Sequence, residues 1–315
     1  MKRVVSGRVW LAICTVYVVW GSTYLAIRWA VRTMPAFASA GVRFVLAAGL
    51  LAVVSRLRGG RSAWRLDAAE WRNAAICGVL MLAGGNGLVV VAETRVPSGL
   101  AALLIAAVPL WLIVLRRVLG DRTPALTLAG VLVGLGGLAL LLLPGSAGSH
   151  VDLGYSMLLV VAALSWAAGS VLVTRVELPG DPAVLSSVEM FAGGVVLLLA
   201  AAGGGEFSKL DLGAISVRSW LSLAYLVVFG SIVAFSAYVY ALANAPMSLV
   251  GTYAYVNPVV AVALGVVLAG EHLSVTEVLG GLIIVASVVV VVSAEGRKRR
   301  TAAQPAVVVD ERAAA

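Results

Sequence analysis

Residues 97–109 read PSGLAALLIAAVP, and residues 246–258 read PMSLVGTYAYVNP. Both stretches begin and end with proline, and the matching prolines are 149 positions apart. Trp71 and Trp220 have the same separation. Solenoid repeats have periods of about 20–50 residues, so a period this long is not one of theirs. The chain therefore contains one long unit twice.

The match between the two units continues on both sides of this stretch, with small changes in spacing. Pairs separated by 147 positions are Pro35 and Pro182, Ala36 and Ala183, and Phe44 and Phe191; pairs separated by 150 are Gly120 and Gly270, Asp121 and Glu271, Gly130 and Gly280, and Leu132 and Leu282. In a membrane protein, a duplicated half of this kind is typical of a transporter with its site between the halves.

The composition predicts an integral membrane protein. Hydrophobic residues make up 61% of the 315, charged residues only 12%, and the mean hydropathy is +1.03. A soluble protein has about 45–50% apolar and about 25% charged residues. The net charge of +8 comes from arginines in short loops, which excludes a nucleic-acid-binding patch. Cys14 and Cys77 lie singly in apolar segments, so no disulfide, metal or cofactor is predicted.

Ten apolar segments are long enough to cross a membrane, which takes about 20 residues. The first follows Lys2, Arg3 and Arg8 and is too long for a signal peptide, so it is expected to remain as a membrane helix. The ten predicted spans are residues 9–27, 35–55, 74–92, 98–119, 126–143, 154–173, 183–202, 220–242, 247–269 and 275–293.

Lysine and arginine predict the orientation of these spans. With the N-terminus inside, the cytoplasmic segments carry 17 of these residues and the opposite segments carry 5. This positive-inside bias predicts that both termini lie in the cytoplasm. The expected location of the protein is the bacterial inner membrane. Because five spans is an odd number, the second unit must have the opposite orientation to the first.

The predicted fold is therefore an all-α integral membrane protein with ten transmembrane helices as two inverted five-helix repeats. The first repeat covers residues 1–145 and the second covers residues 146–294. Residues 295–315 form a basic tail that is expected to be disordered in the cytoplasm.

Several short strings resemble one known family. They are Trp20-Gly21-Ser22-Thr23-Tyr24-Leu25-Ala26-Ile27-Arg28, Arg43-Phe44, Gly85-Asn86-Gly87-Leu88, Pro97 to Pro109, Tyr255-Val256-Asn257-Pro258 and Gly270-Glu271. In this order they resemble the EamA-type members of the drug/metabolite transporter superfamily, over nearly the whole chain to about residue 294. The resemblance implies a fold of two inverted five-helix repeats and export of amino acids, metabolites or xenobiotics.

Two prolines in the middle of spans predict helix kinks. Pro109 and Pro258 each remove one intrahelical hydrogen bond and leave the carbonyl of Ile105 or Ala254 without its usual partner. In the hydrocarbon region a neighbour, water or a ligand must satisfy such a carbonyl. The pair therefore predicts a central cavity that opens alternately to each side, although a kink that serves only packing is equally compatible.

Aromatic and amide residues near these kinks are candidates for lining the cavity. The second unit has three of them where the first unit has Leu104, Ala106 and Val108, so the lining is expected to be asymmetric. Such residues suit a small-molecule substrate with an apolar body and a polar group. The candidate cavity residues are Trp20, Tyr24, Asn86, Trp166, Ser170, Tyr253, Tyr255 and Asn257.

Charged residues inside spans are costly and are functional candidates. Arg43 and Glu189 lie in matching spans that enter the membrane from opposite faces. Glu189 could carry a coupling proton, or it could pair with Arg43 as a structural bridge. Glu93, at the end of the third span, is expected to be a gate or surface residue. The first span contains no acidic residue, although small relatives of the superfamily couple protons there.

The leading hypothesis is a secondary transporter, not an enzyme, that exports small organic molecules by alternating access. Uptake or exchange of a metabolite is the alternative within this class. A membrane-embedded lipid-modifying enzyme is the alternative from another class, but the two histidines, His150 and His272, each have only one acidic neighbour. The expected partners are the substrate and the lipid bilayer, and the protein is expected to be a monomer or a homodimer.

Overall fold

The computed structural model describes residues 6–142, 152–245, 247–250 and 252–303. The described residues form helices and turns and contain no strand. In the first half, up to residue 142, the helices are α1 (Gly7–Ala30), α2 (Ala36–Gly59), η1 (Arg61–Trp64), α3 (Ala68–Gly78), η2 (Val79–Gly87), α4 (Leu88–Ala92), α5 (Ser98–Ile105), α6 (Val108–Val118) and α7 (Ala125–Leu141).

The second half, from residue 152 onward, has a similar order of elements. Its helices are α8 (Leu153–Val173), α9 (Pro182–Gly203), η3 (Phe207–Lys209), η4 (Leu212–Ala214), α10 (Val217–Tyr225), η5 (Leu226–Val233), α11 (Ala234–Asn244), α12 (Met247–Val250), α13 (Tyr253–Ala269) and α14 (Val275–Ala303). The predicted boundary between the halves, at residues 145 and 146, and Pro246 lie outside the described residues.

Eight helical segments of the described chain are long and apolar enough to cross a membrane. Two shorter apolar helices, Ala125–Leu141 and Tyr253–Ala269, lie where the fifth and ninth spans were predicted. The last helix differs from the prediction, because α14 runs on to Ala303 instead of ending at Ser293. The rest of the predicted tail, residues 304–315, lies outside the described residues.

Helix starts follow ordinary capping chemistry. The Ser6 hydroxyl accepts a bond from the backbone of Val9 at the start of α1, and Asp67 and Glu70 form a capping box at the start of α3. Asp152 and Asp181 accept backbone bonds at the starts of α8 and α9. These polar residues mark the positions where the chain enters an apolar helix.

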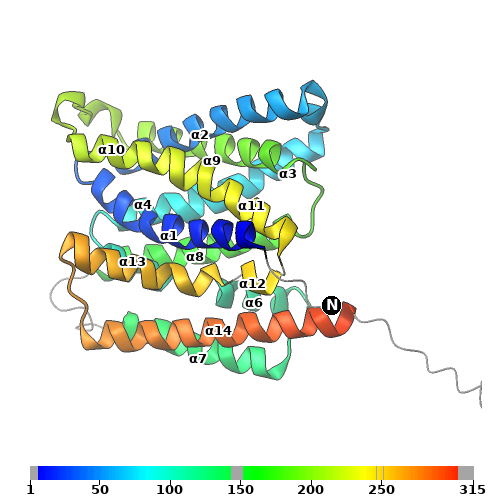
Figure 1. Ribbon diagram of the computed structural model, residues 1–315. Coiled ribbons are helices and arrows are strands. Elements are labelled where there is room, and N and C mark those ends of the chain that lie inside the picture. Colours follow the sequence, from blue (N-terminus) through cyan, green and yellow to red (C-terminus); the bar gives the residue numbers. More distant parts are fainter. Residues whose placement is uncertain (1–5, 143–151, 246, 251, 304–315) are drawn as a thin grey trace, which may run out of the picture.

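The helices lie side by side in one bundle (Figure 1). α2 packs along α9 on one edge, and α7 packs along α14 on the opposite edge. Between these edges α1 packs against α11 and α13, and α8 packs against η2 and α6. Helices of the first half therefore pack against helices of the second half throughout the bundle. The contact of α7 with α14 brings together the last membrane helices of the two halves.

Small residues allow α7 and α14 to approach closely. A methyl group added at Gly137 would lie 2.8 Å from Cγ2 of Ile283 and 3.1 Å from the carbonyl oxygen of Gly280. Both distances are shorter than normal van der Waals contact, so these glycines are required for the observed approach.

Both halves contain a π-helical segment in the middle of their third helical run. η2 covers nine residues and η5 covers eight, and their first residues, Val79 and Leu226, are 147 positions apart. π-Helical turns are rare and occur frequently at functional sites. The two π-helical segments therefore mark one candidate functional region in each half.

The two prolines have different outcomes. Around Pro109 the helix is interrupted, since α5 ends at Ile105 and α6 begins at Val108. Pro258 instead lies within the continuous helix α13. The two prolines therefore differ in their helix boundaries, and the two predicted kinks stay a prediction. Pro109 sits in the first turn of its helix, where the missing N–H costs nothing, whereas Pro258 removes a bond inside α13.

The closest backbone approach in the bundle gives a test of the packing. A methyl group added at Gly78 of α3 would overlap the carbonyl oxygen of Glu189 in α9, whereas one added at Gly49 of α2 meets no atom within 4 Å. We expect Gly78→Ala to destabilise the protein by about 1–3 kcal/mol or more. Gly49→Ala is the matched control and is expected to leave stability unchanged or slightly higher.

The measurement is the fraction of monodisperse protein that remains after heating in detergent. Equal stability of the two variants would contradict the close packing of α3 on α9.

The bundle has two ends, which we name by their acidic residues. At the Glu271 end α1 and α13 finish and α5 begins; it lies on the left in Figure 1. At the Asp121 end α6 finishes and α7 begins, on the right. The site described next lies along α1 between these ends.

Candidate functional site

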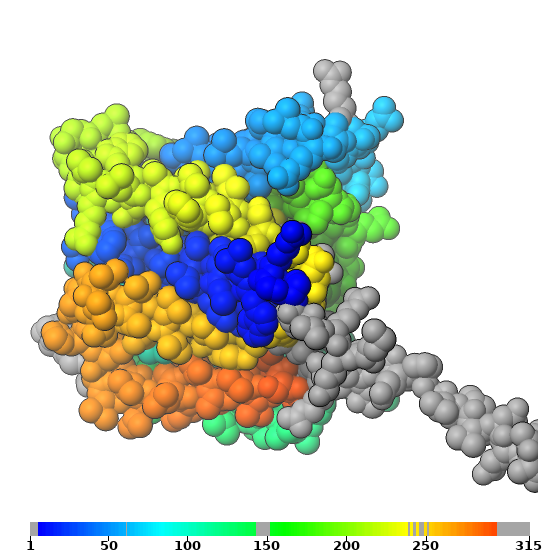
Figure 2. Space-filling view, viewed as in Figure 1, coloured from blue at the N-terminus to red at the C-terminus, as the bar shows by residue number. Residues whose placement is uncertain are grey.

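Three aromatic rings meet at mid-length of α1. The ring centroid of Trp20 is 5.2 Å from that of Tyr238 on α11 and 5.3 Å from that of Tyr253 on α13. The rings of Tyr238 and Tyr253 are 5.7 Å apart and nearly perpendicular. We call these three residues the aromatic cluster. Figure 2 shows α1 at the surface between α11 and α13, the two helices that supply the other rings.

Hydrogen bonding fixes the position of the cluster. The indole N–H of Trp20 donates to the carbonyl oxygen of Gly230 in η5, at 3.1 Å. The π-helical segment η5 therefore lies directly against Trp20 of α1. Tyr24 lies one turn further along α1, in the direction of Arg28. The cluster therefore continues toward the Glu271 end.

Of the predicted cavity residues, three from two distant parts of the chain come together here: Trp20, Tyr24 and Tyr253. Sequence reasoning missed Tyr238, although it is also an aromatic residue within a predicted span. Asn257 is 9% exposed and contacts α1; with its amide correctly oriented, its nitrogen donates to the carbonyl oxygens of Tyr17 and Tyr253. Its observed contacts thus hold α13 against α1. Tyr255 is only partly buried.

Two of the remaining predicted cavity residues, Trp166 and Ser170, lie on α8, which packs against η2. A methyl group at Gly85 would lie 2.9 Å from the Trp166 ring, so Asn86 is adjacent to a glycine that packs on this ring. The Ser170 hydroxyl donates to the carbonyl oxygen of Trp166 within its own helix, at 2.8 Å. Ser170 is therefore already satisfied by α8.

The positions that the repeat relates to the aromatic cluster are apolar. The spacings of the repeat relate Trp20 to Ala167, Tyr238 to Val89 and Tyr253 to Leu104. All three counterparts are buried in the core. The asymmetry predicted from Tyr253 and Leu104 therefore extends to the whole cluster, and only one of the two equivalent regions carries polar aromatic groups.

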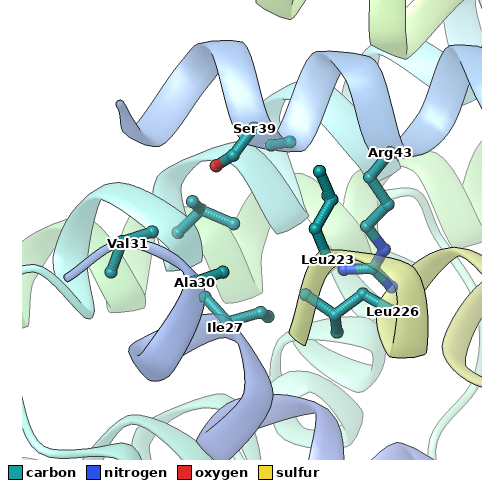
Figure 3. Close-up of a pocket in the computed structure, with 9 residues that line it drawn as sticks. Ile27, Ala30, Val31, Ser39, Arg43, Leu223 and Leu226 are labelled. Atoms are coloured by element: carbon teal, nitrogen blue, oxygen red, sulfur yellow. The ribbon is translucent and has the colours of Figure 1, made fainter. Parts of the chain in front are cut away.

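Arg43 is buried beside a small cavity near this cluster (Figure 3). Its guanidinium reaches from α2 toward Leu223 and Leu226, and its Nε donates to the hydroxyl of Ser231 at 3.1 Å. Its Nη1 has no hydrogen-bond partner. The cavity, lined also by Ala30 and Val90, has a volume of about 10 Å³, which is room for one water molecule.

Arg43 does not pair with Glu189 in the described residues. The guanidinium contacts Ser231 and the Phe44 ring, whose centroid is 4.8 Å away. Glu189 lies on α9 where that helix packs against α3. The predicted bridge between the two residues is therefore not formed, because the two side chains face different neighbouring helices.

Glu93 is the most buried carboxyl group of the described chain, with no exposed surface. Neither carboxyl oxygen has a hydrogen-bond partner. Charges on Arg28, Arg43 and Glu271 interact with it. Of the two expectations for Glu93, a gate or a surface residue, the surface one was wrong: the chain turns directly after α4, and Arg28 of α1 donates to the carbonyl oxygen of Glu93 in this turn.

An ion pair joins the two halves at the Glu271 end. Nε of Arg28, near the end of α1, is 3.6 Å from Oε1 of Glu271, which follows α13. The Arg28 side chain also donates to the carbonyl oxygens of Glu93 and Val96, at 2.8 and 2.9 Å. Glu271 is only 9% exposed.

Glu271 also binds the first residues of α5. Its Oε1 accepts from the backbone N–H and the hydroxyl of Ser98, both at 2.8 Å, and its Oε2 accepts from the N–H of Gly99 at 2.9 Å. A carboxylate at a helix N-terminus satisfies free N–H groups and complements the helix dipole. One side chain thus holds α13, α1 and α5 together.

A second ion pair joins the halves at the Asp121 end. Nη2 of Arg175, after α8, is 3.3 Å from Oδ1 of Asp121, after α6. Oδ2 of Asp121 accepts from Nε of Arg116 at 2.9 Å. Both side chains of the Arg175–Asp121 pair are 37% exposed. This pair is more open to solvent than the pair at the Glu271 end.

The two ion pairs are equivalent in the repeat. Arg28 and Arg175 are 147 positions apart, and Asp121 and Glu271 are 150 apart. In each case the first helix of one half is joined to the end of the fourth helical run of the other half. The sequence contained this signal, since the arginines follow the same spacing as Phe44 and Phe191.

Within the described residues, no group of three or more histidine, cysteine or acidic side chains is arranged to hold a metal ion. Cys14 is exposed on α1 and Cys77 is buried in α3. His150 lies outside the described residues. The chemistry available at the site is therefore aromatic contact, hydrogen bonding and charge.

Comparison with known proteins agrees with this architecture. The model of the EamA-like transporter family matches residues 8–143 and again residues 153–293. The inner membrane transporter YedA of Escherichia coli K12, named as uncharacterized, is 42% identical over 276 residues, which are 87% of each chain. A probable amino-acid metabolite efflux pump of the same organism is 27% identical and covers 85% of this chain and 89% of its own.

A solved structure titled "Crystal structure of protein" has the same fold. Its TM-score is 0.62 at 20% sequence identity, and the match covers 91% of this chain and 98% of the other. The family match falls on each half of the duplicated sequence in turn. The chain therefore belongs to the EamA-like transporter family, and it is a membrane transporter.

Proposed function

We propose that the protein is a secondary transporter that exports small organic molecules across the bacterial inner membrane by alternating access. Its ten membrane helices form two inverted five-helix repeats, with both termini in the cytoplasm. The excess of lysine and arginine on one side and the odd number of spans in each repeat support this topology. The similarity to YedA, which is named as an inner membrane transporter, supports the inner membrane as the location.

The observation that carries the proposal is the pair of equivalent ion pairs at opposite ends of the bundle. Each joins the two halves, so each can hold one end closed. Inverted repeats alternate access when one half rocks against the other around a fixed site. In this mechanism one ion pair breaks while the other remains, and the aromatic cluster between them is exposed to one side at a time.

The substrate follows from the groups around the cluster. The three aromatic rings can contact the apolar part of a substrate. Arg43, whose Nη1 has no hydrogen-bond partner, lies close to Gly230, and the carbonyl oxygen of Gly230 accepts from Trp20. A ligand with an apolar part and a polar or charged group fits this combination. The name of the amino-acid metabolite efflux pump supports amino-acid metabolites as the first class to test.

A screen with a bacterial host tests the function. We expect overexpression of the protein to allow growth at concentrations of a toxic amino-acid analogue or drug that stop the control host. The same compound should then accumulate in inside-out membrane vesicles, because export from the cell corresponds to uptake into such vesicles. The matched control is a host that expresses Tyr238→Leu at the same level.

Two results would contradict the proposal. If right-side-out vesicles accumulate the compound and inside-out vesicles do not, the protein is an uptake system. If purified protein in vesicles moves no amino acid, metabolite or hydrophobic cation under any gradient, the protein is not a transporter of small organic molecules.

A further inference from the structure

The carboxyl group of Glu93 has no role in the packing contacts described above. It is fully buried and neither oxygen accepts a hydrogen bond. A buried carboxylate without a donor is strongly disfavoured relative to the neutral acid. A buried ionisable group without a hydrogen bond suggests a function in which the carboxyl group gains and loses a proton.

The surroundings of Glu93 connect it to one closing contact. The charged and titratable groups that interact with it are Tyr24 and Arg28 of α1, Arg43 of α2 and Glu271 after α13. α8 and η2 also pack against α4 but add no charged group to this set. Arg28 holds the backbone carbonyl of Glu93 and at the same time pairs with Glu271.

Arg28 is therefore shared between two carboxyl groups. While Glu93 is neutral, Glu271 alone attracts the guanidinium, and the Glu271 end is held closed. When Glu93 is charged, it competes for Arg28 and repels Glu271, because two carboxylates near one cation cannot both be fully compensated.

We propose that Glu93 is the proton-binding site of the transporter and that loss of its proton opens the Glu271 end of the bundle. The step is a simple ionisation: the carboxylic acid releases one proton to water, the carboxylate remains, and Arg28 shifts from Glu271 toward it. No other reactant is needed. This inference rests on the proposed function and adds the coupling ion.

Within the described residues, a buried carboxyl group without a hydrogen-bond donor lies beside the ion pair at the Glu271 end. The repeat spacing of 149 around Pro97 and Pro246 relates Glu93 to Leu242, which cannot ionise. The Arg175–Asp121 pair therefore lacks a neighbouring counterpart of Glu93. The two ends are equivalent in their ion pairs but differ in their expected response to pH.

A labelling experiment tests the proposal without a known substrate. The reporter is Ala30→Cys in a background with Cys14→Ala and Cys77→Ala. Ala30 is 2% exposed and lines the small cavity beside Arg43, so a water-soluble maleimide reaches it only when the Glu271 end opens. Raising the pH from about 6 to about 9 is expected to increase the labelling rate about tenfold. The intrinsic pH dependence of thiol reactivity is subtracted with a free-thiol peptide.

Glu93→Gln should make labelling slow at every pH, because glutamine imitates the neutral acid. The matched control is Glu206→Gln at the same end, where Glu206 accepts from the backbone N–H groups of Phe37 and Ala38 and does not face Glu93. This control should keep the full pH dependence. Glu93→Asp retains a carboxyl group and should also keep it, which covers the case in which the glutamine variant does not fold.

The proposal is overturned if labelling of the parent protein does not change with pH, or if Glu93→Gln labels with the parent's pH dependence. A flat response of a folded Glu93→Asp variant would overturn it as well. These results are separate from the substrate screen. Transport together with pH-independent labelling would remove Glu93 as the proton site and leave the proposed function intact.

Discussion

Glu271→Gln is expected to destabilise the protein by about 3–5 kcal/mol, the usual cost of removing one partner of a buried ion pair. Both carboxylate oxygens of Glu271 are used, because Ser98 donates twice to Oε1 and Gly99 donates to Oε2. Glutamine has one acceptor oxygen and an NH₂ group, so one N–H group at the start of α5 would face another donor. Arg28 would also lose its charged partner.

The equivalent residue in the other half provides the control. Asp121→Asn removes the same charge from the matching ion pair, but both side chains of its pair with Arg175 are 37% exposed. Exposed ion pairs contribute about 0–1 kcal/mol. We therefore expect a small change in stability for this variant, although the sequence alone assigns Asp121 and Glu271 the same position.

The measurement is the temperature at which half of the purified protein in detergent is no longer monodisperse. A large drop for Glu271→Gln and a small one for Asp121→Asn is the expected pattern. Equal drops would mean that burial and the contact with α5 do not distinguish the two ends, and they would weaken the role of Glu271 as the residue that holds three helices together.

The sequence predicted much of the helical framework. Length and hydropathy located most of the apolar helices within a few residues, since a long apolar run is stable inside a membrane, although α14 runs on to Ala303. The π-helical segments η2 and η5 could not be predicted, because the shift in hydrogen-bond register has no known residue pattern of its own.

The candidate site was predicted only in part. Aromatic residues at mid-span identified Trp20, Tyr24 and Tyr253, but Trp166 and Ser170 lie in another group because α8 packs against η2 and α6. Glu93 was assigned to a gate or the surface from its place at a span end, and its burial depends on helices that are distant in sequence, since α2 and α8 pack against α4. The two ion pairs join residues that are distant in sequence, so only the repeat spacing of the arginines could have indicated them.

The final prediction compares two tyrosines on α11 that differ only in their surroundings. Tyr238 belongs to the aromatic cluster, with Trp20 and Tyr253 within 5.2 and 5.7 Å, whereas Tyr240 is 40% exposed. We expect Tyr238→Leu to reduce transport at least about tenfold, since loss of about 1.4 kcal/mol of substrate contact has that effect. Tyr240→Leu should transport like the parent protein.

The comparison is made by initial rates of uptake into inside-out vesicles that contain equal amounts of each folded variant. Because both substitutions remove the same atoms from the same helix, a general effect on α11 would change both rates alike. Equal loss in the two variants, or normal transport by Tyr238→Leu, would exclude the aromatic cluster as the substrate site.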